Sequence, residues 1–134
     1  ILKLINLSEN YGFSELIDNC LVQNKNKITK ILNENNYNND DCIIILRTFL
    51  SKAKKILKLA TKLEQNKDID KTINLAKPPI FWKDKEITKR QIYKWTSASI
   101  RKLIVKLSEI ELLIKKNMNN LINITTDFII NHST

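Results

Sequence analysis

The sequence holds few of the side chains that bind metals or attack substrates. Its only thiols are those of Cys20 and Cys42, and its only imidazole is that of His132, near the end of the chain. Two cysteines and one distant histidine do not supply the Cys and His ligands of a tetrahedral zinc site. We therefore interpret both cysteines as small buried hydrophobic residues rather than as a disulfide, a usage that fits a reducing cytoplasm.

The acidic residues give no better candidate for catalysis. Asp40 with Asp41, and Asp68 with Asp70, stand where helices are expected to begin, and their charges are favourable at a helix N-terminus. The sequence has no glycine-rich phosphate loop, and no nucleophile forms a convincing pair with the distal histidine. We predict no catalytic residue, no cofactor and no metal site in this segment.

The basic residues point to a different kind of chemistry, the binding of phosphate groups. The chain carries a formal net charge of +9 and has an isoelectric point near 9.6, as expected of a protein that binds nucleic acid. Five basic residues would follow one side of a long predicted helix: Arg47, Lys54, Lys55, Lys58 and Lys62. We favour a solvated face, enriched in lysine by the codon bias of an AT-rich genome, and keep a phosphate-facing stripe as the alternative. No aromatic residue interleaves with these lysines, although base stacking usually requires one.

Composition predicts that helices position these residues. The 134-residue chain is 43% hydrophobic and 28% charged, which is enough for one compact domain with a core. Gly12 is the only glycine and both prolines fall in one segment, so a β-rich fold with many tight turns is implausible. We predict an all-α bundle of about six to seven helices, with Asn in the left-handed turn positions that Gly usually occupies.

Hydrophobic periodicity places the helices along the chain. The strongest pattern predicts a long helix that begins after a cap at Asn39 or Asp40 and ends near Gln65. Ser14 and either Thr96 or Ser97 are expected to cap two further helices. The expected elements are helices over 14–22, 27–35 and 40–65, a short helix from 68, a helix opened by Pro79, a long helix from 97 and a last one over 120–131.

Seven apolar residues of the two long helices extend beyond the main stripes. They are Ile43, Ile44, Ile45 and Leu59 in the first helix and Val105, Leu112 and Leu113 in the second. Both a second core layer and a surface for partner helices explain such residues. Lys or Asn interrupts every apolar run before it is long enough to span a bilayer, so we expect a soluble protein.

The segment 77–95, KPPIFWKDKEITKRQIYKW, contains both prolines and both tryptophans of the chain. Because the residue before a proline is disfavoured in the α conformation, we expect the prolines to separate two helical layers. Phe81, Ile87, Ile92 and Trp95 can be partly aligned on one side of the helix that follows. We expect Phe81 and Trp82 to pack in the core, with a partner contact as the alternative.

Three runs together resemble a known family. They are FSELIDNCL, ITKILNENNYNNDDCIIILRTFLSKAKKILKL and KPPIFWKDKEITKRQIYKWTSASIRKLIVKLSEIELLIKK, which between them cover about 13–117. Their order and spacing resemble the C-terminal region of the delta subunits of bacterial DNA polymerase III, which belong to the clamp loader. Where such chains often have Gly-Asp between the first two helices this one has Gln23 and Asn24, and Asn38 and Asp41 stand where Gly and Pro are frequent before the long helix.

The resemblance implies a fold, a function and partners. It implies that 13–134 form the helical collar domain and that 1–12 are the tail of a preceding lid-like domain. A collar domain is a non-catalytic part of the polymerase holoenzyme and packs beside equivalent domains of the tau/gamma and delta-prime subunits. The sliding clamp would be bound by upstream domains, and DNA would be reached only indirectly, in the assembled cytoplasmic complex. The candidate interface or packing residues are Pro78, Pro79, Phe81, Trp82, Gln91, Trp95, Glu111 and Lys115.

Two further expectations come from the N-terminal residues and from the basic stripe. The chain begins with Ile1 rather than Met, and ILKLINL resembles no signal peptide, so we expect a segment of a longer polypeptide. The competing hypothesis of a different class is a freestanding basic helical domain that binds nucleic acid through the stripe from Arg47 to Lys62.

Overall fold

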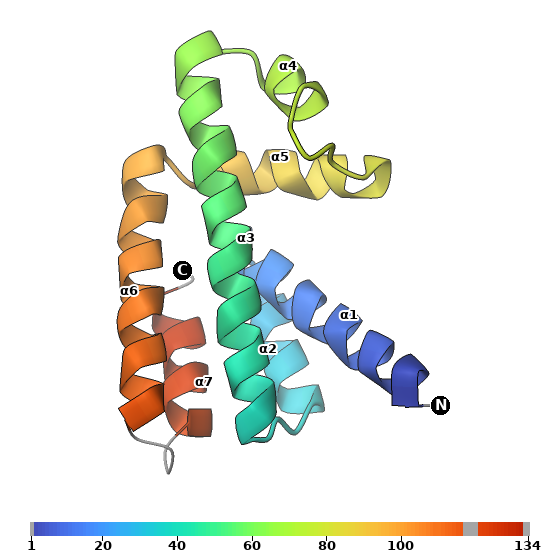
Figure 1. Cartoon of the computed structure of the whole chain (residues 1–134), viewed down its shortest axis with the longest axis vertical. Helices are drawn as coiled ribbons and strands as arrows, with labels where there is room; N and C mark the ends of the chain where they lie inside the picture. Colours follow the sequence, from blue (N-terminus) through green and yellow to red (C-terminus); the bar gives the residue numbers. More distant parts are fainter. Residues whose placement is uncertain (1, 117–120, 133–134) are drawn as a thin grey trace.

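The computed structural model describes the backbone of residues 2–116 and 121–132 and the side chains of residues 12–116 and 121–131. These parts of the chain form seven α-helices and one 3-10 turn and contain no strand, which confirms the predicted all-α bundle (Figure 1). The elements are α1 (Leu2–Leu21), α2 (Lys25–Glu34), α3 (Asn39–Asn66), α4 (Ile69–Asn74), η1 (Trp82–Asp84), α5 (Lys85–Lys94), α6 (Ser97–Lys116) and α7 (Leu121–His132).

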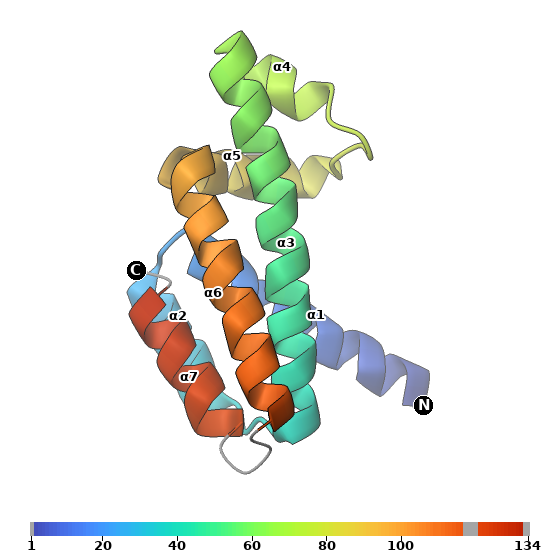
Figure 2. The same ribbon diagram turned by 60° about the vertical axis from the view of Figure 1, so that its left-hand side comes forward.

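Helix α3 is the central element of the bundle. Helix α6 runs antiparallel beside it, while α1 crosses its lower half and α4 and α5 pack near its upper end (Figure 1). Helices α2 and α7 lie side by side against the lower part of the bundle (Figure 2). The 28 residues of α3 therefore contact almost every other helix, which explains why the longest apolar stripe of the sequence lies there.

The core forms where the apolar stripes of these helices meet. Phe49 of α3 is fully buried, and its ring meets that of Phe128 on α7 edge to face, with 6.2 Å between the ring centroids. Among the seven apolar residues for which both a core and an interface role were considered, Ile45 and Leu59 are buried. These two residues therefore belong to the core of the chain itself. The side chains of Cys20 and Cys42 are buried free thiols, as predicted.

Asparagine caps helices in this fold rather than taking left-handed positions. Asn24 caps α2, and Asn38 forms a capping box with Asp41 at the start of α3, where the two hydrogen bonds measure 2.8 and 3.0 Å. The cap of α3 thus lies one residue before the expected Asn39. In the part of the chain that the structure describes, the residues with left-handed backbone are Gln23 and Lys67, so the predicted role of Asn is wrong for these two turns. An Asn side chain satisfies the free N–H groups of a helix start, which Gly does not do.

Two other predicted helix starts were also wrong. Helix α1 begins at Leu2 and continues through Gly12 and Ser14, because a single glycine costs a helix only about 1 kcal/mol. Helix α5 begins at Lys85 rather than at Pro79, and the prolines lie in an irregular connection after α4. By contrast, Asp68 caps α4, and reciprocal hydrogen bonds between Thr96 and Ser99 cap α6, as expected.

None of the helices described here is long and apolar enough to cross a membrane.

Candidate interaction surfaces

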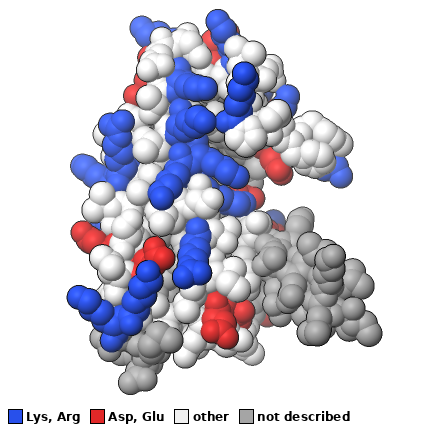
Figure 3. Space-filling view, viewed as in Figure 1, with Lys and Arg blue, Asp and Glu red and all other residues white. Residues whose placement is uncertain are grey.

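A row of lysines follows the exposed side of α3. The space-filling view shows Lys and Arg gathered over the upper part of this helix (Figure 3). Lys54, Lys55 and Lys58 are exposed and Lys62 is half-buried. Among the residues that the structure describes, no carboxylate forms an ion pair with any of these four ammonium groups. We call these four residues the lysine row.

Lys58 connects the lysine row to the proline segment. Its ammonium group donates a hydrogen bond of 3.2 Å to the backbone carbonyl of Lys77, which is itself exposed. This contact places the backbone of another exposed basic residue, 19 positions away in the chain, beside the row. Sequence periodicity could not predict this contact, because the connection after α4 has no repeat that would indicate where it runs.

Arg47 does not belong to the same group. Its guanidinium lies 3.8 Å from the carboxylate of Glu111 on α6, and Lys115 lies 4.0 Å from the same carboxylate. The expected pair of Glu111 and Lys115 is thus present, and the three side chains border a small hollow of about 60 Å³ between α3 and α6. Exposed ion pairs of this kind contribute at most about 1 kcal/mol to the free energy of unfolding. We therefore interpret the three side chains as a weak link between α3 and α6.

Gln91 and Trp95, two of the candidate interface or packing residues, are buried inside the bundle. The amide of Gln91 donates hydrogen bonds of 3.2 and 3.3 Å to the carboxylate and the backbone carbonyl of Asp18, and Lys52 donates one of 2.8 Å to the same carboxylate. The indole N–H of Trp95 donates a bond of 2.7 Å to the carbonyl of Leu21, at the end of α1. These four contacts join α1, α3 and α5, so both residues have packing roles.

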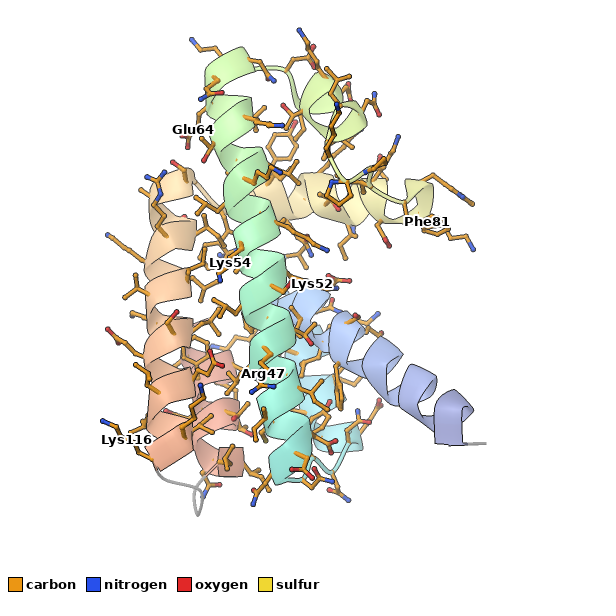
Figure 4. The ribbon with its side chains drawn as sticks, in the orientation of Figure 1. Arg47, Lys52, Lys54, Glu64, Phe81 and Lys116 are labelled. Carbon is orange, nitrogen blue, oxygen red and sulfur yellow. The ribbon has the colours of Figure 1, made fainter. Side chains whose placement is uncertain are left out.

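Phe81 and Trp82 are exposed, which contradicts the prediction that they pack in the core. Their side chains are 57% and 69% accessible, and the rings contact each other with 5.9 Å between centroids. The segment with Pro78 and Pro79, both exposed, leaves the bundle after α4, and the chain becomes helical again only at η1. The two rings therefore never join the apolar stripe of α5. Figure 4 places Phe81 at the outer end of this region, away from α3.

The outer side of α6 is the second exposed feature of interest. Val105, Leu112 and Leu113 are 56%, 60% and 43% accessible, although the opposite side of the helix lies in the core. Their spacing of seven and eight residues places them on one face. Figure 4 shows Lys116, from the same end of α6, pointing away from α3. Ile44, at the start of α3, is also exposed, while Ile43 is half-buried.

The described residues offer no reactive centre at either surface. Burial raises the pKa of the Cys42 thiol, which favours the unreactive protonated form, and burial together with the nearby carboxylate of Asp41 raises the pKa of Tyr37. No group of three or more His, Cys, Asp or Glu side chains in the described part of the chain could hold a metal ion. The side chain of His132 lies outside the described residues. The features of interest among the described residues are thus two exposed surfaces, the lysine row of α3 and the outer side of α6.

Glu64 joins the upper ends of α3 and α6 and has a measurable pH signature. Its carboxylate accepts hydrogen bonds of 3.1 Å from the backbone N–H of Ser97 and 2.8 Å from its hydroxyl, and Figure 4 shows the side chain beside the start of α6. The backbone bond is the main reason that the pKa of Glu64 lies below its ordinary value of 4.5. A carboxyl with a lowered pKa stabilises the fold above its unfolded pKa, and this stabilisation is lost as the pH falls through the folded one.

We therefore expect the stability difference between wild type and Glu64→Gln to be constant near neutral pH and to shrink as the pH falls from 4.5. Urea denaturation of both proteins at several pH values between neutrality and 3 measures this difference. Glu109→Gln is the control, because Glu109 is an exposed glutamate of α6 whose side chain has no hydrogen bond or ion pair with any other described residue. If Glu64→Gln and Glu109→Gln follow the same pH profile, the contact with Ser97 has no role in stability.

Comparison with known proteins adds no relative: no protein-family model matches the chain, and neither the curated proteins nor the solved structures contain a significant match.

Proposed function

We propose that this chain is a non-catalytic assembly module, the collar domain of a clamp-loader delta subunit that acts in cytoplasmic DNA replication. The observation that carries the proposal is the outer face of α6, where Val105, Leu112 and Leu113 are exposed on a helix that is otherwise part of the core. The resemblance of the sequence to delta subunits supplies the identity of the partners, namely the helical domains of the tau/gamma and delta-prime subunits.

Burial of this apolar face of α6 under a partner helix would lower the free energy of the assembly. Three large apolar side chains in water forgo the free energy of burial, which amounts to about 1.5 to 3 kcal/mol for each one that becomes fully buried. Glu109 and Lys116 border them, giving the mixture of apolar centre and charged rim that is common in interfaces between folded domains. A partner helix laid along α6 would bury the apolar residues and leave these charges at the edge.

Co-purification with the partner subunits tests this proposal. The chain, mixed with the tau/gamma and delta-prime subunits encoded by the same genome, should elute with them in size-exclusion chromatography. The affinity of the double variant Leu112→Asp, Leu113→Asp for these subunits should be lower by a factor of about ten or more, because two carboxylates would have to be buried at the interface. Both leucines are exposed, so the free variant should keep its fold, which circular dichroism verifies.

The control is Leu75→Asp, which places one such charge on a comparably exposed leucine at the end of α4, and it is compared with the single variant Leu112→Asp as well as with the double variant. We expect this variant to assemble like the wild type. A wild-type chain that remains alone in the presence of the subunits would contradict the assembly function. Equal losses for the control and the double variant would contradict the assignment to α6.

A further inference from the structure

We propose that the lysine row of α3, together with Lys77, is a binding surface for the phosphate backbone of double-stranded nucleic acid. This inference goes beyond the proposed assembly function, because it concerns a different helix and a different class of partner. It begins from an imbalance of charge: the basic side chains outnumber the acidic ones by nine, and part of that excess is gathered on one side of α3 (Figure 3).

Ion pairs distinguish the lysine row from the other two cations of α3. Arg47 is paired with Glu111 on α6, and Lys52 is paired with Asp18 on α1. Glu64, near the end of α3, accepts hydrogen bonds from the N–H and the hydroxyl of Ser97 and forms no ion pair with any lysine of the row. The row therefore keeps its positive charge while neighbouring cations on α3 are neutralised. A cluster of like charges without counter-charges costs stability and is compensated when an anion binds.

The geometry of the row fits a polymer of phosphates. Lys54, Lys58 and Lys62 follow one another at intervals of four residues, so their α-carbons extend over about 12 Å of a straight helix. One strand of a duplex carries a phosphate for every 3.4 Å of its axis, so the row faces about three or four phosphates. Lys58 uses one of its three donors on the carbonyl of Lys77 and keeps two for an anion.

The absence of rings along the row favours a duplex over a single strand. Single-strand binders stack bases on aromatic side chains that lie within the basic groove. No aromatic residue lies between positions 50 and 65 of α3, and Phe81 is directed away from this helix (Figure 4). Contacts from lysines to phosphates carry no base information, so binding by this surface is expected to be independent of sequence.

Fluorescence anisotropy with labelled 20-base-pair DNA duplexes of two unrelated sequences tests the inference. With four phosphate contacts, the logarithm of the affinity should fall with the logarithm of the salt concentration with a slope of about −3.6. This slope corresponds to a loss of affinity of about 150-fold between 50 and 200 mM salt. The triple variant Lys54→Gln, Lys58→Gln, Lys62→Gln keeps Lys55 and Lys77, so its slope should be no steeper than about −1.8 and its loss over the same range no more than about 12-fold.

The matched control removes three charges elsewhere. Lys25, Lys27 and Lys30 are exposed on α2, and their replacement by Gln lowers the net charge by the same amount. We expect this control to keep the wild-type slope. Equal changes in the two triple variants would show that only the net charge matters and would overturn the assignment to α3. Tighter binding of a 20-nucleotide single strand, or no salt-dependent binding at all, would also overturn the inference.

The result of the duplex-binding experiment does not depend on the proposed assembly function. The charge-removal variants leave α6 unchanged, and Leu112→Asp, Leu113→Asp leaves the lysine row unchanged. Failure of the duplex experiment with normal co-purification would therefore reject only the phosphate surface.

Discussion

Replacement of Trp95 by alanine is expected to lower the free energy of unfolding by about 3 to 5 kcal/mol, whereas Trp82→Ala should change it by less than about 0.5 kcal/mol. The two tryptophans are only 13 positions apart, but Trp95 is buried and Trp82 is 69% exposed. The loss at Trp95 has two parts, the cavity left by the indole and the unpaired carbonyl of Leu21, to which the indole N–H donates.

Urea denaturation followed by far-ultraviolet circular dichroism measures both changes without relying on tryptophan fluorescence. Trp95→Phe separates the two parts, because it keeps most of the apolar volume and leaves the carbonyl of Leu21 without its partner. An unpaired buried acceptor costs about 1 to 3 kcal/mol, so the variant should lie between wild type and Trp95→Ala. If Trp82→Ala lowered the free energy of unfolding as much as Trp95→Ala, Trp82 would have to be a core residue, as the sequence-based prediction held.

The contrast between these tryptophans shows what sequence periodicity can and cannot determine. Within α3 and α6, apolar residues repeat at helical spacing over many turns, and the buried positions of both helices follow that repeat. After Pro78 and Pro79 the backbone is irregular for several residues, so spacing no longer indicates a face. Phe81 and Trp82 stand in this stretch, and hydrophobicity alone predicted them to be buried.

Polar contacts between distant parts of the chain could not be predicted from the sequence either. Asp18 meets Lys52 and Gln91, which are 34 and 73 positions away. Each of the three residues looks like an ordinary polar position of its own helix, and only the crossing of α1, α3 and α5 brings them together. The pair of Glu111 and Lys115, in contrast, was predictable because both partners are one turn apart in one helix.

The spacing of the basic stripe could be read from the sequence for the same reason. Lys54, Lys58 and Lys62 follow one another at intervals of four residues in α3, where Lys54 and Lys58 are exposed and Lys62 is half-buried. Spacing could not reveal that Arg47 faces Glu111 across the gap to α6, because that contact depends on the register of two antiparallel helices. The structure thereby reduces five candidate residues to four and adds Lys77 through its contact with Lys58.

Phe49→Ala is the second substitution with a large expected effect, about 3 to 5 kcal/mol of stability. Phe49 is fully buried at the middle of α3, where the helix meets α1, α6 and α7. Its ring is also the edge-to-face partner of Phe128, so its removal leaves a cavity under α7. Because domains of this kind are stable by only about 5 to 15 kcal/mol, the variant should unfold at a much lower urea concentration.

A double-mutant cycle with Phe49→Leu and Phe128→Leu isolates the contribution of the ring pair, which we expect to be about 0.5 to 1.5 kcal/mol. Ile44→Ala is the control on the same helix, since its side chain is exposed and should lose little stability. Native-state hydrogen exchange adds a local readout: in Phe49→Ala the amides of α7 should lose more protection than those of α4, because Phe49 belongs to the first half of α3 and α4 lies beside the other end of that helix. Equal losses in both helices would mean that the ring stabilises the bundle as a whole, and that α7 has no special dependence on the contact between Phe49 and Phe128.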